Sequence, residues 1–195
     1  MNVGSLAPEV VVPLLRGRLG RPYLYVERCA STQRLLAADA PEGAIAVAEE
    51  QTAGRGRLGR EWHAPPRSSI LVSIVLRPPV PPAQLPELSI VAGRSVAAAL
   101  AETSAVAPTV KPPNDVLVDG KKVAGILAEA SDGRVVLGIG VNVNQRDDEL
   151  PPAVAATSLR IATGHEIERA HVLAAILAEL EVEYEDWVSG FATSG

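Results

Sequence analysis

Apolar residues recur along the chain with two periods, and each period predicts one kind of secondary structure. Alternating or continuous apolar runs predict strands at 22–27, 44–50, 69–76, 116–118, 122–130 and 135–143. Apolar residues three and four positions apart predict long helices at 84–103 and 168–187. Shorter helices are expected at 6–16 and, after the N-cap residue Ser31, at 33–40. The run 69–76 is apolar on both faces, so we expect that strand to lie inside the sheet.

The connections between consecutive strands indicate the fold class. Asp119-Gly120 and Ser131-Asp132-Gly133 are tight-turn sequences between predicted strands, which favours antiparallel hairpins. We therefore expect an α+β fold, with a mixed, mostly antiparallel sheet and helices packed on one face, and not a wound α/β sheet. A chain of 195 residues suits one core. We assign it to one domain at 1–188, followed by a short polar tail at 189–195.

Composition and charge narrow the classes of partner. The formal net charge is −5, which argues against a general nucleic-acid binder, because such domains are usually basic. The single cysteine, Cys29, excludes an internal disulfide and fits a reducing compartment. No apolar run reaches the ~20 residues of a membrane span, and no secretory signal pattern is visible at the start. We expect a cytoplasmic protein without a membrane partner.

A cluster of arginine and glycine stands out within the predicted loop 51–68. Gly54, Gly56 and Gly59 alternate with arginines at 55, 57 and 60, and Trp62 follows. Glycines leave the backbone bare, and guanidinium groups pair with phosphate or carboxylate in a bidentate way. Long loops are usually functional. On an acidic chain, this local basic cluster suits a small anionic ligand.

The spacing Gly54-x-Gly56-x-x-Gly59 also matches the dinucleotide-binding fingerprint, which requires a following helix and an acidic residue about 20 positions on. Pro65 and Pro66 would break that helix. The residues at 76–79 are Leu-Arg-Pro-Pro, without a carboxylate for a ribose. We therefore reject a nicotinamide or flavin site.

Three further clusters have ordinary structural explanations when each is taken alone. Ser31-Thr32-Gln33 could simply begin a helix. The run 111–115, Lys-Pro-Pro-Asn-Asp, and the lysines at 121 and 122 could be turn residues and surface charges of a hairpin. In 138–142, two glycines at alternate positions of a strand precede Asn142, which suggests close approach by a ligand or another backbone.

Taken together and in this order, the clusters resemble the catalytic domain of biotin protein ligases, over roughly residues 22–187. The matching segments are Ser31-Thr32-Gln33, 51–62, Pro113-Asn114-Asp115, 122–127 and 138–142. Pro112 departs from the family, which usually has tryptophan there. Many relatives also carry an N-terminal DNA-binding domain and a C-terminal β-barrel. This sequence enters the catalytic domain almost at once and stops before a barrel, so we expect a ligase without a repressor function.

The resemblance implies an ATP-dependent biotin protein ligase with a biotin/lipoate ligase-like fold. Such an enzyme activates biotin as biotinyl-5′-AMP and transfers it to a lysine of a carboxylase's biotin carrier domain. Biotin and ATP are then substrates, and Mg²⁺ is expected on the phosphates without a dedicated set of protein ligands. The carrier domain is the expected protein partner, a homodimer is one further expectation, and nucleic acid is not a partner.

The resemblance also assigns roles to residues of this chain. It implies catalytic roles for Lys122, Arg55 and Arg57, with Asp115 as a candidate base. The expected biotin-binding residues are Ser31, Thr32, Gln33, Gln51, Gly54, Arg55, Lys122, Gly125, Gly138 and Gly140. The expected nucleotide-binding residues are Arg57, Arg60, Trp62, Lys111, Asn114 and Asn142.

Two other functions stay open on the sequence. A lipoate or octanoate ligase-type acyltransferase has a related fold and similar acyl chemistry, although the Gly-Arg-Gly-Arg loop favours biotin. A non-catalytic biotin-binding sensor belongs to a different class, and the retained cations at 55, 57 and 122 argue against it.

Overall fold

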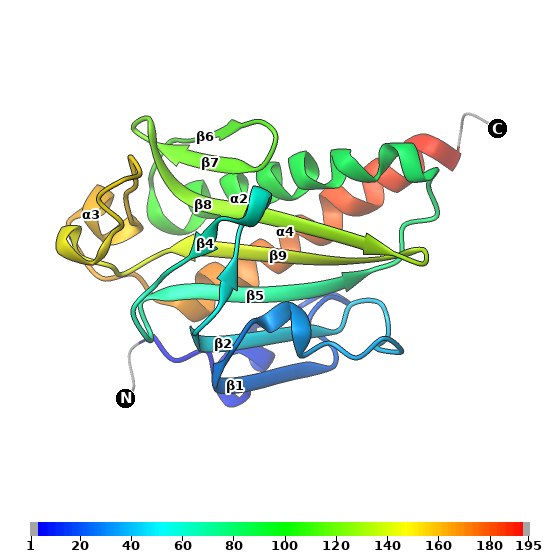
Figure 1. Cartoon of the computed structure of the whole chain (residues 1–195), viewed down its shortest axis with the longest axis horizontal. Helices are drawn as coiled ribbons and strands as arrows, with labels where there is room; N and C mark the ends of the chain where they lie inside the picture. Colours follow the sequence, from blue (N-terminus) through cyan, green and yellow to red (C-terminus); the bar gives the residue numbers. More distant parts are fainter. Residues whose placement is uncertain (1–3, 193–195) are drawn as a thin grey trace.

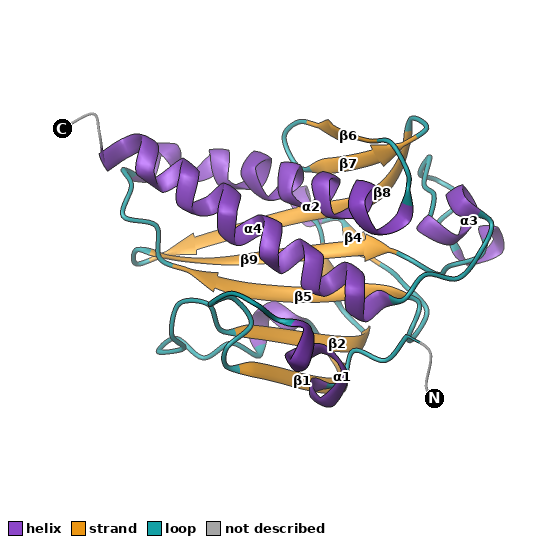
Figure 2. Ribbon diagram, turned by 180° about the vertical axis from the view of Figure 1, so that it is seen from behind, coloured by secondary structure: helices purple, strands orange, loops and turns teal. Residues whose placement is uncertain are grey.

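The computed structural model describes residues 4–192 and contains one large sheet with two long helices on one face (Figures 1 and 2). Within these residues, the sheet has seven strands in the order β1-β2-β5-β9-β8-β7-β6. They are β1 Tyr23–Cys29, β2 Ile45–Gln51, β5 Ser69–Leu76, β6 Pro108–Lys111, β7 Asp115–Val118, β8 Lys121–Ser131 and β9 Arg134–Asn142. Only the β1–β2 pair is parallel, which confirms the expected mixed, mostly antiparallel α+β fold.

Strand β5 is central, as its apolar run predicts. All eight of its residues are buried, and it pairs with β2 on one side and with β9 on the other. The pairing with β9 is continuous from Ser69–Asn142 to Leu76–Val135. Because β5 is buried on both faces and paired along both edges, it forms a rigid base for the site.

The long helices α2 Leu88–Ser104 and α4 Arg169–Ala192 lie side by side on the back of the sheet (Figure 2). The buried side chains of α2 recur three and four positions apart and join the main apolar core. The opposite face carries a small hairpin of β3 Gly54–Arg55 and β4 Glu61–Trp62, drawn in cyan in front of the sheet in Figure 1.

The remaining elements are short. The α-helices are α1 Pro8–Val11 and α3 Leu159–Thr163, and the 3-10 turns are Val12–Leu14, Thr32–Arg34, Arg57–Gly59, Pro82–Glu87 and Asp147–Glu149. The helix expected at 6–16 is thus limited to α1 and one 3-10 turn. This fits the presence of Pro13, which cannot donate a backbone hydrogen bond.

The expected helix at 33–40 is wrong. Only a 3-10 turn, Thr32–Arg34, forms there, and the Ser31 side chain makes no capping hydrogen bond. Leu35 and Leu36 leave the turn to pack against the buried end of the sheet at Ala44 and Val75. This tertiary packing outweighs the local helix signal.

Other elements also differ from the sequence-based prediction. The helix expected at 84–103 begins as a 3-10 turn and becomes α-helical at Leu88, and β6 forms where no strand is predicted. The segment 51–68 contains the β3–β4 hairpin in addition to loop. The last helix continues past 187 to Ala192, so part of the expected polar tail is helical, and Trp187 and Phe191 make an edge-on ring contact within it. Residues 193–195 of that tail lie outside the described residues.

Candidate functional site

A cavity of about 350 Å³ lies under the β3–β4 hairpin. That hairpin is on the face of the sheet opposite α2 and α4 (Figures 1 and 2). The floor of the cavity consists of strands β5, β8 and β9, and its lid is the β3–β4 hairpin. Nearly all the residues expected from the sequence line it: Ser31, Thr32, Gln33, Gln51, Arg55, Arg57, Arg60, Trp62, Lys111, Asn114, Asp115, Lys122, Gly125, Gly138, Gly140 and Asn142. Segments up to about 100 residues apart in the sequence therefore meet in one place.

Gly54 is the expected residue that does not line the cavity. It is buried in the hairpin opposite Trp62, and a Cβ atom there would lie 2.5 Å from the Trp62 carbonyl oxygen. Gly54 is thus needed for close pairing of the hairpin, since any side chain would push β4 away.

One end of the cavity is polar and largely buried. The Gln51 Oε1 atom accepts hydrogen bonds from the Thr32 backbone N–H at 2.8 Å and from the Thr32 hydroxyl at 3.1 Å. The Thr32 hydroxyl also lies 2.7 Å from the hydroxyl of Ser73, in the middle of β5. Gln33 donates to the carbonyl oxygens of Leu127 and Val136 at 3.3 and 3.4 Å. This end offers both donors and acceptors to a small polar ligand group.

The centre of the cavity is an apolar slot above two neighbouring glycines. Gly125 and Gly140 are register partners on β8 and β9. A Cβ atom on Gly140 would lie 2.6 Å from Trp62 Cε2, and one on Gly125 would lie 2.9 Å from Trp62 Cζ3. The two glycines therefore make room for the indole ring. Gly138 faces Gln33 instead, with 3.3 Å from its hypothetical Cβ to Gln33 Nε2.

The other end of the cavity is charged. The Lys122 Nζ atom lies 2.7 Å from Asp115 Oδ1 and 5.6 Å from the centroid of the Trp62 ring. Arg55 pairs with Glu129 of β8 through two contacts, at 2.9 and 3.4 Å. Two of the cations expected to meet an anionic ligand are thus paired with carboxylates in this structure.

Arg57 and Arg60 are exposed at the rim, where they flank the tip of the hairpin. Lys111 is also exposed and lies opposite Asp115 in the β6–β7 register. Asn114 is half-buried, and its side chain donates to the Ile126 carbonyl oxygen at 3.0 Å. Cations at a rim of this kind attract polyanions without being desolvated themselves.

Sequence reasoning missed one wall of the cavity, which is formed by Pro151 and the segment 154–156. This segment is fixed to Lys122: the Lys122 N–H donates to the Ala155 carbonyl oxygen at 2.8 Å, and the Thr157 N–H donates to the Lys122 carbonyl oxygen at 2.9 Å. A run of alanine and valine carries no chemical signal, so only its position in space identifies it. Ser73, an isolated serine in an apolar strand, was missed as well.

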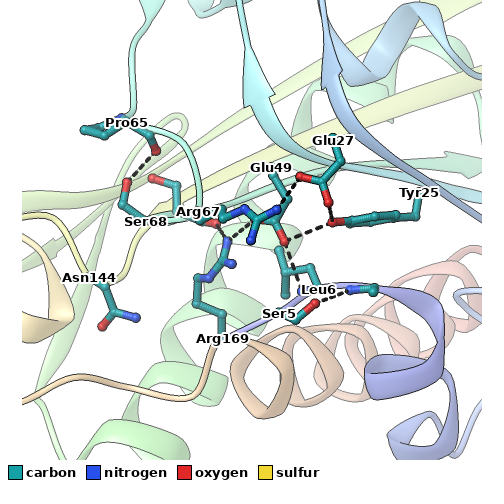
Figure 3. A network of polar contacts seen from close by, with 12 residues as sticks. Ser5, Leu6, Tyr25, Glu27, Glu49, Pro65, Arg67, Ser68, Asn144 and Arg169 are labelled. Carbon is teal, nitrogen blue, oxygen red and sulfur yellow. Dashed lines mark hydrogen bonds and ion pairs between the residues drawn. The ribbon is translucent and has the colours of Figure 1, made fainter. Parts of the chain in front are cut away.

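The return end of the hairpin loop is anchored to a polar network (Figure 3). Arg67 donates to the Glu27 carboxylate at 2.9 Å, and its backbone N–H donates to the Glu49 carbonyl oxygen at 3.1 Å. Hydrogen bonds from Tyr25 and Arg67 lower the pKa of Glu27. Arg169, at the start of α4, forms an ion pair with Glu49 at 2.7 Å, and both side chains are only 2% exposed. The Arg169 guanidinium also donates to the Ser69 carbonyl oxygen at 2.8 Å.

Across residues 4–192, no three His, Cys, Asp or Glu side chains are grouped so that they could hold a metal ion. Over the same residues, no helix has the length and apolar character needed to cross a bilayer.

Comparison with known proteins places this geometry in a family. Residues 25–145 match the model of the biotin/lipoate A/B protein ligase family. The chain is 38% identical over 182 residues to the bifunctional ligase/repressor BirA of Bacillus subtilis, covering 88% of this chain and 56% of that protein. It is 41% identical over 151 residues to the biotin–[acetyl-CoA-carboxylase] ligase of Mycobacterium tuberculosis, covering 75% and 56%. The chain thus spans about half the length of the curated relatives it matches.

A solved structure agrees with these sequence matches. The biotin protein ligase of Aquifex aeolicus, in complex with biotin and ATP, superimposes with a TM-score of 0.78 at 36% identity, over 85% of this chain and 71% of that one. A family match over more than half of the chain, together with relatives near 40% identity, leads to one conclusion: this chain belongs to the biotin/lipoate A/B protein ligase family.

Proposed function

We propose that this chain is an ATP-dependent biotin protein ligase. A biotin carboxylate oxygen attacks the α-phosphorus of ATP, and pyrophosphate leaves, which gives biotinyl-5′-AMP. A lysine amine of a carrier domain then attacks the acyl carbon, AMP leaves, and the amine loses a proton. The observation that carries the proposal is the single cavity that joins a buried polar end to a cationic end. The names of the relatives and the biotin and ATP bound to the Aquifex aeolicus ligase support it.

We place the biotin ring at the polar end. A ureido group has both N–H donors and a carbonyl acceptor, which suits the hydroxyl of Thr32 and the amide of Gln51. Ser31, Gln33 and the bare backbone of Gly138 complete this end. The cavity volume of about 350 Å³ lies within the range of small-molecule sites.

The slot above Gly125 and Gly140 is proposed to receive the rest of the biotin ring. The Trp62 indole fills that slot, so it must move outward when a ligand enters. The displaced indole then offers an apolar face on which adenine can stack. Arg57, Arg60, Lys111 and Asn114 are proposed to contact the nucleotide, with Asn142 shaping the wall beside it; these assignments rest on the family resemblance.

The charged end is proposed to bring two anions together. Lys122, Arg55 and Arg57 offset the repulsion between the biotin carboxylate and the phosphates, and fixed cations are most effective where water is excluded. Lys122 and Arg55 exchange their present partners, Asp115 and Glu129, for these anions. Asp115, released from Lys122, is then available as a base for the incoming lysine. A Mg²⁺ ion would be held mainly by phosphate oxygens, as magnesium usually keeps few protein ligands.

The same proposal includes a carrier domain of a carboxylase as the protein partner and the cytoplasm as the location. The net charge of −5 disfavours a nucleic-acid partner. A homodimer is the further expectation, and sedimentation velocity of the purified chain tests it directly.

The family also contains lipoate ligases, so the acid must be identified by experiment. We would incubate the full chain with ATP and Mg²⁺ and measure pyrophosphate release with biotin, lipoate or octanoate. Release with biotin alone supports a biotin ligase, whereas release with lipoate or octanoate alone indicates the acyltransferase alternative. Tight biotin binding by calorimetry without any pyrophosphate release would indicate a non-catalytic sensor.

A further inference from the structure

Gln145 lies three residues beyond the end of β9 and is 1% exposed, although nothing in the proposed reaction uses it. Its side-chain Nε2 donates to the Ser69 hydroxyl and to Asn142 Oδ1, the latter at 2.9 Å. Its Oε1 atom has no partner among the described residues. Burying an amide costs free energy unless all its polar atoms form hydrogen bonds. The buried position of Gln145 therefore calls for an explanation.

The bonds of Gln145 lead to Lys122. Asn142, held by Gln145 at its oxygen, donates through Nδ2 to the Thr157 carbonyl oxygen at 3.1 Å. The Thr157 N–H in turn donates to the Lys122 carbonyl oxygen at 2.9 Å. The Gln145 carbonyl oxygen also accepts from the hydroxyl of Ser158 at 2.7 Å, the next residue of the same segment. Gln145 therefore holds the segment 155–158 in two ways: through Asn142 at Thr157, and directly at Ser158.

Lys122 needs such support because the sheet pairs it on one side only. The β8–β9 register begins at Ala124 and Val141, two residues beyond Lys122. On the other side, Lys122 is the register partner of Leu117 in β7, and the β7–β8 register shifts beside this pair, between Val116 and Leu117. The backbone of Lys122 is instead bonded to Ala155 and Thr157, as a parallel bridge outside the regular ladder.

Ser69, the other hydrogen-bond partner of the Gln145 side chain, is itself firmly held. Ser69, whose hydroxyl accepts from Gln145, also accepts at its carbonyl oxygen from Arg169. Arg169 in turn is paired with Glu49 in the core (Figure 3). The Arg169 guanidinium thus ties the Ser69 backbone to a buried carboxylate on the neighbouring strand β2, which holds Ser69 in place.

We propose that Gln145 is a positioning residue: with Asn142, it ties the segment 155–157 to the sheet and so fixes the backbone from which Lys122 reaches the reacting anions. The kinetic part of this proposal rests on the proposed ligase function. Asp115 holds the Lys122 ammonium only until the anionic substrate replaces the Asp115 carboxylate. In the reacting complex, Lys122 is then held only through the bonds of its backbone to Ala155 and Thr157. An error of about 1 Å in the position of a reacting group can cost about 10²-fold in rate.

The chain offers a matched control one residue away. Asn144 is another amide in the same loop, and it exchanges two hydrogen bonds with the backbone of Ile167, both at 2.9 Å. These two bonds join Asn144 to the segment before α4 and not to the segment that holds Lys122. Gln145→Met and Asn144→Leu each replace an amide by an apolar group of similar size. Gln145→Glu keeps the shape but removes both donors.

The test compares these variants in the full chain by pyrophosphate release and by hydrogen exchange of backbone amides. Gln145→Met and Gln145→Glu should lower kcat by about 10- to 100-fold, with the KM for biotin changed less than about threefold. Exchange of the Lys122 and Thr157 amides should speed up more than about tenfold, as expected for lost local structure. Asn144→Leu should leave kcat and these two exchange rates near the parent values, even where its melting temperature falls equally.

The proposal is overturned if the Gln145 variants keep kcat within about threefold of the parent, or if Asn144→Leu loses as much. Failure of the ligase function gives a different pattern. The parent chain would then release no pyrophosphate, and the exchange comparison alone would decide whether Gln145 positions Lys122. Unchanged protection of Lys122 and Thr157 in Gln145→Met would end the proposal in that case as well.

Discussion

The indole of Trp62 lies directly on the backbone of Gly140, so close that a methyl group at Gly140 would stand 2.6 Å from the ring. Trp62 comes from the arginine-rich hairpin, and Gly140 lies in β9, next to the central strand β5. The contact closes the cavity over the sheet. It makes the hairpin a lid whose closed position depends on one side chain and on glycines beneath it.

Gly140→Ala should therefore lift the indole out of its slot. The chain has only two tryptophans, so emission from Trp62 can be followed in a Trp187→Phe background. We expect the emission to shift to longer wavelength as the ring becomes exposed to water. Gly138→Ala is the control on the same strand, because its tightest contact would be with the movable end of Gln33, and the Leu127 carbonyl oxygen at 3.5 Å is an ordinary contact. Identical emission from the Gly140→Ala variant and its parent would contradict the observed seat of the indole.

Lys122→Ala should nearly abolish adenylate formation while the fold stays intact. Loss of one preorganised electrostatic group costs about 10²–10³ in rate. Lys121→Ala is the matched control: Lys121 is exposed and does not line the cavity, since neighbouring strand residues point to opposite faces. Pyrophosphate release by the Lys122→Ala variant within about threefold of the parent would remove Lys122 from the mechanism.

The hairpin should become harder to cleave when ligand is bound. Leu58, at its tip, is 83% exposed, and the arginines at 57 and 60 beside it are exposed as well. Few apolar contacts hold this tip, so we expect residues 57–60 to be mobile until a ligand binds. Trypsin cleavage at Arg55, Arg57 or Arg60 should slow several-fold when biotin and ATP are added. Equal cleavage with and without these ligands would argue against ordering of the lid.

Arg169→Met should destabilise the whole domain because it leaves Glu49 buried without its partner. Breaking a buried pair in this way typically costs about 3–5 kcal/mol. For a domain of this size, each kcal/mol lowers the melting temperature by roughly 2–4 °C. The double variant Arg169→Met/Glu49→Gln should recover part of the loss, since no unpaired charge is then buried. Thermal unfolding followed by circular dichroism measures both, and a double variant less stable than the single one would refute the explanation.

Parts of the fold and of the site could be predicted wherever the residue types themselves indicate the structure or the chemistry. The apolar run of β5 predicted a central strand, and the Asp119-Gly120 turn predicted the β7–β8 hairpin. The motif residues met in one cavity because each was recognised by its chemistry: cation, amide, hydroxyl or bare glycine backbone. Most of the fold and most of the cavity lining were predictable in this way.

Contacts made over long distances were not predictable. The helix expected at 33–40 gave way to packing of Leu35 and Leu36 on the sheet, which no local propensity reports. The wall at 154–156 has only alanine and valine side chains, and Gln145 acts through partners at 69 and 142. The alternate glycines at 138 and 140 signalled a close approach, but not that the Trp62 ring makes it at Gly140.

The central claim is that this chain joins biotin to a protein lysine at the expense of ATP. The most direct measurement is the intact mass of a purified biotin carrier domain after incubation with the chain, biotin, ATP and Mg²⁺. We predict the addition of one biotinyl group per carrier, dependent on ATP and lost when the acceptor lysine is replaced by arginine. A carrier of unchanged mass, under conditions in which an established biotin ligase modifies it fully, would contradict the claim.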